Sequence, residues 1–273
     1  MFRYTWRTAI LEVLMVLVGL LFVFPIYVLI TLSLKAPGDQ SGLLAPPIEP
    51  TLQNFADAWQ QGGFAGALVN SAIVTLTTVA LTVIFAAAAA YPLSRLGARW
   101  SKLTYFAFLA GLLLPVQLAL LPLYQTIRDL GLLGTLVGVI IVYVGGGMPF
   151  AIFLYAGFMR ALPGEYEEAA AIDGAHAFRT FWSVVFPLLR PITGTVVILT
   201  AVGTWNDFLT PLLYLSGTDQ QTVTVAINGF VGQFGAQWNL IFAGIIISIL
   251  PILIAYFLLQ KYIVQGFAGG LKG

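Results

Sequence analysis

The chain has 273 residues, of which 59% are hydrophobic and only 8% charged, and its mean hydropathy is +0.94. Soluble domains carry about 25% charged residues, so this composition indicates an integral membrane protein. The apolar runs are long, which indicates helices rather than the alternating segments of about 10 residues that form membrane β-barrels. A net charge of +1 argues against nucleic-acid binding. The lack of cysteine excludes disulfides and thiolate metal sites, and the single histidine, His176, argues against a histidine metal site.

Six apolar stretches are close to the roughly 20 residues with which a helix crosses the hydrocarbon core. We therefore expect an all-α integral membrane protein with one transmembrane domain over residues 1–273. The expected spans are residues 10–34, 68–93, 103–123, 135–159, 192–214 and 240–259. The expected connections are extracellular loops at residues 35–67, 124–134 and 215–239, and a polar loop at residues 162–191. A cleaved signal peptide is the alternative for the first stretch, but its apolar core would be shorter, at roughly 7–15 residues.

Lys and Arg are distributed unevenly about these spans. Six spans place both termini on one side of the membrane. That side holds two Lys or Arg in the N-terminal segment, three in the loop after the second span, three in the loop after the fourth span and two in the tail. The other side holds only Lys35 and Arg128. Because cytoplasmic loops are enriched in Lys and Arg, we expect both termini and residues 162–191 to face the cytoplasm.

Two of the expected spans contain residues that do not suit a plain lipid-facing helix. Three consecutive glycines (residues 145–147) and Pro149 are expected to break the fourth span. Non-helical backbone at membrane depth needs protein or a water-filled cavity around it, so Gly146 is a candidate pathway-lining residue. A simple hinge or a close helix crossing is the alternative. The fifth span contains Asp207, and intramembrane carboxylates are candidates for a transport pathway or for helix pairing.

Residues 162–191 form a polar island between apolar spans and read LPGEYEEAAAIDGAHAFRTFWSVVFPLLRP. Four carboxylates gather near its start: Glu165, Glu167, Glu168 and Asp173. Pro163 and Gly164 precede good helix formers, and acidic groups in the first turn suit the positive end of a helix dipole. Gly174 stands where a left-handed residue would end such a helix. We predict a short polar helix that stops at Gly174.

A second short helix is expected after Gly174. Four apolar side chains recur at positions i, i+3, i+4 and i+7, and would share one helix face: Phe178, Phe181, Trp182 and Val185. Pro187 and Pro191 are expected to end this helix. A polar helix, a glycine and an amphipathic helix together are typical of a docking surface.

The spacing within this island resembles that of a known family. Glu168-Ala169-Ala170, three residues, Gly174, nine residues and an apolar run before Pro187 resemble the EAA loop of permease subunits of ABC importers. Val184 and Phe186 are conservative departures, since the pattern usually has Ile and Leu there. The segments PTLQNFADAW, WNDFLTPLLYL and GFAGGLKG resemble the MalG-like members of the carbohydrate-uptake branch. The resemblance covers most of the chain and implies the six-helix permease fold of a type I importer, with a cytoplasmic coupling helix.

The resemblance implies that the island docks on a cytoplasmic ATPase. Glu165, Glu167 and Glu168 would face Arg or Lys of that partner, while nearby alanines and an isoleucine would fill an apolar groove. The full set of expected coupling residues is Glu165, Glu168, Ala169, Ala170, Ile172, Asp173, Gly174 and Pro187. The alternative is a solvated amphipathic loop without a partner.

The resemblance also implies roles for residues outside the island. Four residues are candidates for the sugar pathway: Trp205, Asn206, Asp207 and Gly146. The alternatives are that the WND segment only organises helix packing and that the companion permease holds the sugar. The loop at residues 215–239, whose segment TVTVAINGF looks extended, would reach the binding protein through Asn228, Gly229 and Phe230, unless it is an ordinary connection. The tail would contact the ATPase dimer through Gly269, Gly270, Lys272 and Gly273.

The chain contains no Gly-Lys dipeptide, so it lacks a P-loop and cannot be the ATP-hydrolysing subunit itself. We expect a non-catalytic permease subunit of an ATP-driven, binding-protein-dependent sugar importer in a bacterial or archaeal cell (inner) membrane. It would bind no cofactor or metal, because ATP and Mg belong to the partner ATPase. Its expected partners are a second homologous permease in a heterodimer, a cytoplasmic ATPase dimer, an extracellular or periplasmic sugar-binding protein and membrane lipid, but no nucleic acid.

Two other classes of transporter remain open from the sequence. One is a permease of another ABC importer class, which would carry amino acids, phosphate or glycerol-phosphate. The other is a secondary transporter, which would need repeated halves and ion-coupling carboxylates at the midplane of the membrane. Asp207 is the one candidate for such a carboxylate, and no internal repeat is evident. The sequence therefore favours the importer.

Overall fold

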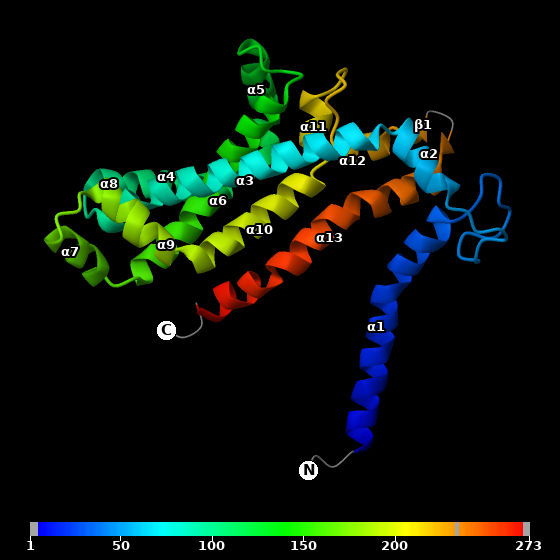
Figure 1. The fold of residues 1–273 in the computed structure, drawn as a ribbon, viewed down its shortest axis with the longest axis horizontal. Coiled ribbons are helices and arrows are strands. Elements are labelled where there is room, and N and C mark those ends of the chain that lie inside the picture. Colours follow the sequence, from blue (N-terminus) through cyan, green and yellow to red (C-terminus); the bar gives the residue numbers. More distant parts are fainter. Residues whose placement is uncertain (1–4, 233–234, 270–273) are drawn as a thin grey trace. The chain divides into compact units, whose positions relative to one another are not determined.

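The computed structural model describes residues 5–232 and 235–269. Its elements are helices, apart from one short antiparallel pair, β1 (Val231–Gly232) with β2 (Gly235–Ala236), among the described residues. The chain divides into two compact units, Met1–Ala65 with Val225–Leu250 and Gly66–Thr224 with Pro251–Gly273. Three helices contribute residues to both units: α3 (Phe64–Arg95), α12 (Val223–Asn228) and α13 (Trp238–Gly269) (Figure 1).

The first unit contains α1 (Trp6–Ser33), whose surface after Glu12 is apolar on every side. The Thr5 side chain caps its N-terminus by accepting a hydrogen bond from the backbone N–H of Thr8. Large apolar side chains remain exposed along its length, among them Met15 and Phe22. A helix that is apolar all round and not covered by protein is suited to lipid. α1 is therefore a candidate membrane-spanning helix.

A buried amide on α2 (Gln53–Gln61) forms the polar centre of the first unit. The Asn54 side chain is fully buried, and its Nδ2 donates to the carbonyl oxygens of Ser33 and Lys35, both at 2.8 Å. Its Oδ1 accepts a hydrogen bond of 2.8 Å from Nδ2 of Asn239, at the start of α13. Asn54 thus joins the end of α1 to α2 and to the start of α13.

In the second unit, α6 (Leu136–Ala161) packs against α4 (Arg99–Leu113) and α10 (Arg190–Asn206) (Figure 1). The core combines small residues of α3 with larger residues of α6. These residues are all fully buried, and they are Ala86, Ala87 and Ala90 on α3 with Ile152, Tyr155 and Met159 on α6. Small residues let helix backbones approach closely in lipid. This core therefore fixes α3 relative to α6 within the second unit.

Four helices of the described chain are long and apolar enough to cross a membrane: α1, α3, α6 and the Trp238–Phe257 part of α13. Two bent helix pairs raise the number to as many as six if each pair is one span. The first pair is α4 with α5 (Val116–Asp129), bent by 108°, and the second is residues 177–188 with α10, bent by 76°. The structure thus holds between four and six candidate spans.

The third expected span differs from the observed helices. A single helix was expected at residues 103–123, whereas α4 ends at Leu113 and α5 begins at Val116. Leu114 and Pro115 lie between them with ψ of 125° and 123°. Pro115 has no N–H to continue the helix, and it also disfavours helical dihedral angles at the residue before it.

Two further expectations about local structure are wrong. α6 runs unbroken through the three glycines (residues 145–147) and Pro149. A glycine costs a helix roughly 1 kcal/mol, which is less than unsatisfied backbone groups cost in lipid. The TVTVAINGF segment is not extended, because Val223–Asn228 forms α12. The buried side chains of α12 are Val223 and Ala226, which are three residues apart, a helical spacing.

The fifth expected span, residues 192–214, corresponds to two helices. α10 begins at Arg190 and ends at Asn206, and α11 (Leu209–Tyr214) follows it. Asp207, which caps the end of α10, is extended with a ψ of 132°. The change of direction at Asp207 separates the long helix from the short one.

Replacing Asn54 by Ala should lower the thermal stability of the assembled protein. The substitution leaves the carbonyl oxygens of Ser33 and Lys35 without their buried donor, which costs about 1–3 kcal/mol for each unsatisfied group. Thermal unfolding of the detergent-solubilised protein measures the effect. Gln53→Ala is the matched control, because Gln53 is an exposed neighbour on the same helix. Equal unfolding temperatures for the two variants would contradict this account.

Candidate functional site

The polar island begins with α7 (Glu165–Ile172), which has three glutamates in its first turn. Gly174 follows the helix with a φ of +75°, as predicted. The N–H of Gly174 bonds to the carbonyl of Ala171 at 3.0 Å, and the N–H of Ala175 bonds to the carbonyl of Ala170 at 2.9 Å. This pair of bonds is a Schellman motif, which satisfies the last carbonyls of the helix and reverses the chain. A Cβ at Gly174 would meet nothing within 4 Å, so the backbone angle and not space favours glycine.

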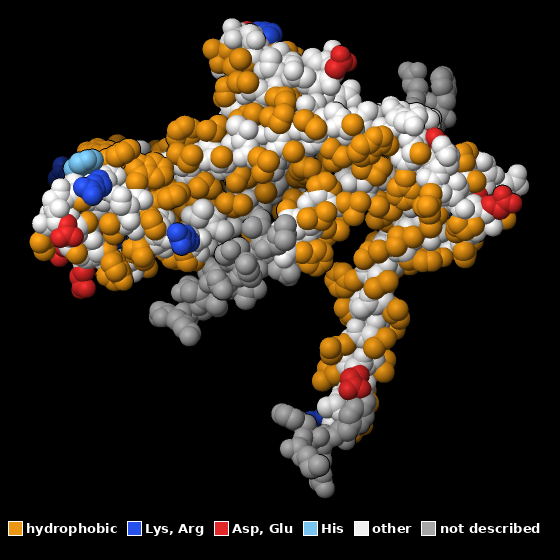
Figure 2. Space-filling model, viewed as in Figure 1, with side chains coloured by type: hydrophobic (Ala, Val, Ile, Leu, Met, Phe, Trp, Pro, Cys, Tyr) orange, Lys and Arg blue, Asp and Glu red, His pale blue; other side chains and the backbone are white. Residues whose placement is uncertain are grey.

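Most of the predicted coupling residues lie at the surface of α7 and its C-terminal turn. Ala170 is buried against the rest of the second unit and Pro187 is half-buried. The exposed members are Glu165, Glu168, Ala169, Ile172, Asp173 and Gly174. Ile172 is 87% exposed, although a free isoleucine side chain is unfavourable in water. On the face shown in Figure 2, charged side chains gather around α7 and α8 (Ala177–Thr180). α7 thus presents carboxylates beside an uncovered apolar side chain.

The second short helix of the island contains a π-helical turn. It consists of α8, then η1 (Phe181–Val185) as the π-helical part, then α9 (Phe186–Leu188). Phe181 and Val185 are buried as predicted, but Phe178 is 69% exposed. The predicted common face is therefore wrong for Phe178. It lies in the first turn of α8, beyond the core, where its ring contacts those of His176 and Trp182.

An aromatic cluster anchors this second helix on the bundle. The ring of Trp182 lies 4.9 Å from that of Phe181 and 5.0 Å from that of Phe186. Phe181 in turn packs against Tyr91 of α3 at 5.3 Å. His176 caps the N-terminus of α8, because its Nδ1 accepts a hydrogen bond from the N–H of Arg179. The island is thus held to α3 through aromatic side chains.

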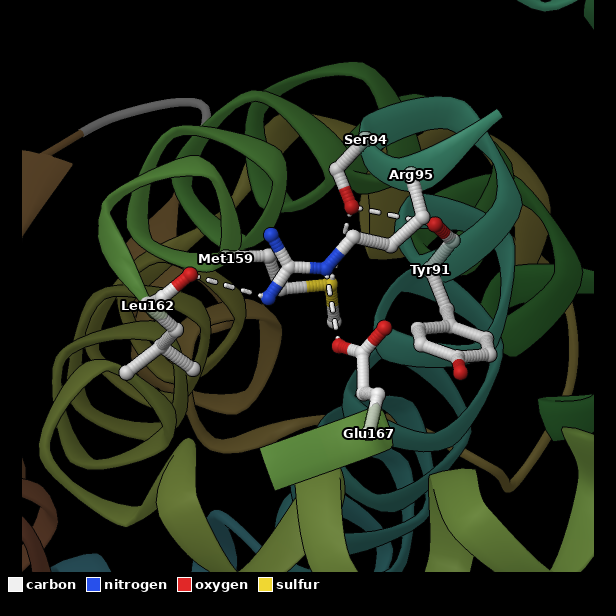
Figure 3. Close-up of polar contacts among 6 residues, drawn as sticks. All are labelled: Tyr91, Ser94, Arg95, Met159, Leu162 and Glu167. Carbon is white, nitrogen blue, oxygen red and sulfur yellow. Dashed lines mark hydrogen bonds and ion pairs between the residues drawn. The ribbon is translucent and has the colours of Figure 1, made fainter. Parts of the chain in front are cut away.

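An ion pair links the island to α3 a second time (Figure 3). Arg95, the last residue of α3, donates from Nε to Oε1 of Glu167 at 2.8 Å. Its Nη2 also donates to the carbonyl oxygen of Leu162 at 3.1 Å. Glu167 was expected to face the ATPase, but its carboxylate is engaged within the chain. From the sequence, Arg95 was only one of the three Lys or Arg in the loop after the second expected span, because no local spacing connects residues 72 positions apart.

Gly146 and Asp207, two of the predicted pathway residues, line one cavity of about 560 Å³. Its other polar lining comes from α5, α6, α10 and α11, namely Gln117, Tyr143, Thr200, Thr204 and Thr210. The other two predicted residues lie outside that lining. Trp205 is buried, and the exposed Asn206 donates from Nδ2 to the Val202 carbonyl of its own helix. The cavity therefore brings together half of the predicted pathway set.

Asp207 organises the change from α10 to α11. Its Oδ2 accepts a hydrogen bond of 3.0 Å from the hydroxyl of Tyr143, on α6. Its Oδ1 accepts one of 3.0 Å from the N–H of Leu209. Its carbonyl oxygen accepts one of 2.8 Å from the hydroxyl of Thr224. The residue thus contributes to helix packing whether or not a ligand enters the cavity, and Tyr143 is a partner that sequence reasoning missed.

The predicted binding-protein residues lie in the first unit. Asn228 and Gly229 are exposed. Phe230 is buried, and its ring stacks on that of Phe64 at 6.4 Å, so it supports the unit rather than presenting a free side chain. Gly269 is the last residue of α13, and the other predicted tail residues, Gly270, Lys272 and Gly273, lie outside the described residues. No group of three His, Cys, Asp or Glu in the described chain is arranged to hold a metal ion.

Comparison with known proteins agrees with the observed fold. A family described as "Binding-protein-dependent transport system inner membrane component" matches residues 81–269, which include the whole island. The melibiose/raffinose/stachyose import permease protein MelC of Bacillus subtilis is 36% identical over 251 residues, 91% of this chain and 91% of MelC. The multiple sugar-binding transport system permease protein MsmG of Streptococcus mutans is 31% identical over 98% of this chain and 96% of its own.

A solved structure gives the same result for the fold. It is a bacterial ABC transporter involved in the import of the acidic polysaccharide alginate. One of its chains matches with a TM-score of 0.83 and 22% identity, over 96% of this chain and 99% of that one. The predicted helical permease fold is confirmed, as is the family to which the EAA spacing pointed. The chain belongs to the family of binding-protein-dependent transport system inner membrane components, the permeases of ABC importers.

Proposed function

We propose that this chain is the transmembrane permease subunit of an ATP-driven, binding-protein-dependent importer of sugars, and that it forms half of the translocation pathway. The observation that carries this proposal is the match along almost the full chain to permeases named for sugar import. A third such relative, the starch degradation products permease AmyC of Thermoanaerobacterium thermosulfurigenes, is 32% identical over 93% of the chain. The substrate class of these relatives favours a sugar over amino acids or phosphate.

Coupling to the ATPase is assigned to the exposed surface of α7. Glu165, Glu168 and Asp173 offer carboxylates to basic residues of the partner, while Ala169 and Ile172 offer apolar contact. Burial of an exposed isoleucine stabilises a complex by about 1.5–3 kcal/mol, so docking would cover Ile172 favourably. Gly174 and Pro187 hold the two short helices that present this surface. The same surface without a partner would leave Ile172 in water.

The other subunits follow from this assignment. The chain has no P-loop, so ATP and Mg belong to a cytoplasmic ATPase dimer and this subunit needs no cofactor. A second homologous permease would complete the pathway as a heterodimer. Asn228 and Gly229 would meet the sugar-binding protein on the opposite side of the membrane. The excess of Lys and Arg on the side of the termini supports a cytoplasmic location for both termini and for α7.

The cavity that Asp207 and Gly146 line is proposed as a stretch of the sugar pathway. Its hydroxyl and carboxyl groups can hydrogen-bond to sugar hydroxyls, and the glycines of α6 leave room beside them. Thr200 and Thr204 add two hydroxyl groups from α10. Asp207 therefore serves both packing and passage in this proposal.

Reversing the charge of Glu168 should uncouple the importer. Glu168→Lys places a cation against basic residues of the ATPase, and like charges across an interface cost several kcal/mol. We expect ATP-dependent sugar uptake in proteoliposomes with the binding protein to fall at least about tenfold. Glu49→Lys makes the same charge change at an exposed position outside the island and should leave uptake unchanged. Full uptake and normal recovery of the complex with Glu168→Lys would refute the docking role.

Neutralising Asp207 should slow passage of the sugar without preventing assembly. Asp207→Asn keeps an oxygen for the N–H of Leu209 but loses a charge-assisted hydrogen bond, which contributes about 1.5–3 kcal/mol. We expect maximal uptake to fall about tenfold while ATPase stimulation by the loaded binding protein persists. Asn206→Asp, just outside the cavity, is the control. An unchanged maximal rate for Asp207→Asn would restrict Asp207 to helix packing.

A further inference from the structure

Arg95 lies where three helix ends of the second unit meet (Figure 3). It is the last residue of α3, Leu162 caps the end of α6, and Glu167 lies in the first turn of α7. The guanidinium group donates to both of the other two: to the carboxylate of Glu167 at 2.8 Å and to the carbonyl of Leu162 at 3.1 Å. One side chain thus connects α3 to α6 and to α7.

The environment of the pair favours a fixed geometry. The side chains of Arg95 and Glu167 are 21% and 19% exposed, so water screens the pair less than it would on an open surface. The planar guanidinium presents its donors in a rigid fork, which lets one group hold two acceptors at once. Next to it, Ser94 donates from Oγ to Sδ of Met159 at 3.4 Å, which adds a second polar contact between α3 and α6.

The covalent connections of α7 would not by themselves hold it to α3. α7 follows α6 through Leu162, Pro163 and Gly164, and it leads to α8 through the turn at Gly174. Both connections join α7 to its neighbours in the chain, whereas α3 lies about 70 residues earlier. The Arg95–Glu167 pair is the polar contact by which α7 reaches α3 in the described structure.

The two kinds of glutamate on α7 also face different surroundings. Glu167 turns toward Arg95 (Figure 3), whereas Glu165 and Glu168 are exposed. The first turn of α7 therefore has an inner carboxylate bound within the chain and outer carboxylates available to a partner. The inner carboxylate thus gives the outer surface of α7 a direct polar connection to α3.

We propose that Arg95 is a positioning residue that makes α7 and the end of α3 move as one body, so that displacement of α7 drives α3 directly. Without it, displacement of α7 would act through α6 and α10, which flank the island in sequence, and would reach α3 only by way of the Phe181–Tyr91 ring contact beyond the Gly174 turn. This inference rests on the proposed function, in which an ATPase moves α7. Arg95 itself contacts neither ATP nor sugar; it sets how much of each ATP-driven movement reaches the spans.

The test measures sugar imported per ATP hydrolysed by the assembled importer in proteoliposomes with its binding protein. Arg95→Gln and Glu167→Gln should each lower this ratio by about two- to fivefold, the range that a partly exposed ion pair supports. The double variant Arg95→Gln with Glu167→Gln should be no worse than either single variant, because all three lose the same interaction. Arg99→Gln, four residues along the same basic segment and exposed, is the matched control and should keep the wild-type ratio.

A distance measurement separates a mechanical role from a merely structural one. The chain has no cysteine, so spin labels can be attached at Gly97→Cys, just after α3, and Tyr166→Cys, on α7. In the wild-type importer the distance between the labels should stay the same with and without ATP. In the Arg95→Gln or Glu167→Gln variant, the distribution of distances between the labels should broaden when ATP is added.

Three outcomes would overturn the inference: an unchanged ratio in both single variants, an additive loss in the double variant, or a label distance that changes with ATP in the wild type. If Arg95→Gln does not assemble, Glu167→Gln decides alone, since it keeps the size and shape of the side chain. Failure of the proposed function is distinguishable, because the wild-type importer would then show no ATP-dependent uptake at all.

Discussion

The left-handed turn at Gly174 is the constraint on which the coupling surface depends. With a φ of +75°, Gly174 ends α7 and sends the chain back toward the bundle. That reversal places Phe181 and Val185 in the core while the outer face of α7 stays exposed. Acidic and apolar groups thereby project from a helix whose following segment is anchored among aromatic rings. A residue with a Cβ would have to adopt a conformation that L-amino acids disfavour by roughly 1–2 kcal/mol.

Three polar residues stabilise the chain at places where helices end. Asn54 closes the helix ends of the first unit, Asp207 sets the change from α10 to α11, and Arg95 joins three helix ends near the island. Each satisfies backbone groups that lose their partners at a helix terminus. Between these points the core is built mainly of apolar side chains, together with buried threonines and a hydrogen bond from Tyr155 to Thr193. Rigid helices with polar joints can pass a movement from α7 into the membrane-spanning part.

Sequence patterns predicted what depends on neighbouring residues. The helical membrane class followed from composition, and the conformation of Gly174 followed from its place after a short acidic helix. The predicted break in α6 was wrong because a helix in lipid tolerates glycine better than it tolerates unpaired backbone groups. The Arg95–Glu167 pair and the Tyr143–Asp207 hydrogen bond join residues 72 and 64 positions apart, so only the fold brings them together. The sequence alone therefore could not show that Glu167, rather than Glu165 or Glu168, is the carboxylate bound within the chain.

The central claim is that the exposed face of α7 docks on the ATPase, and site-directed cross-linking tests it most directly. Because the chain lacks cysteine, Ile172→Cys supplies a single thiol on the most exposed apolar side chain of α7. In the assembled importer this thiol should cross-link to the ATPase subunit, and ATP should change the yield. Met15→Cys, also exposed but on the apolar helix α1, should not cross-link. An importer that retains its ATPase yet gives no cross-link from Ile172→Cys would contradict the account.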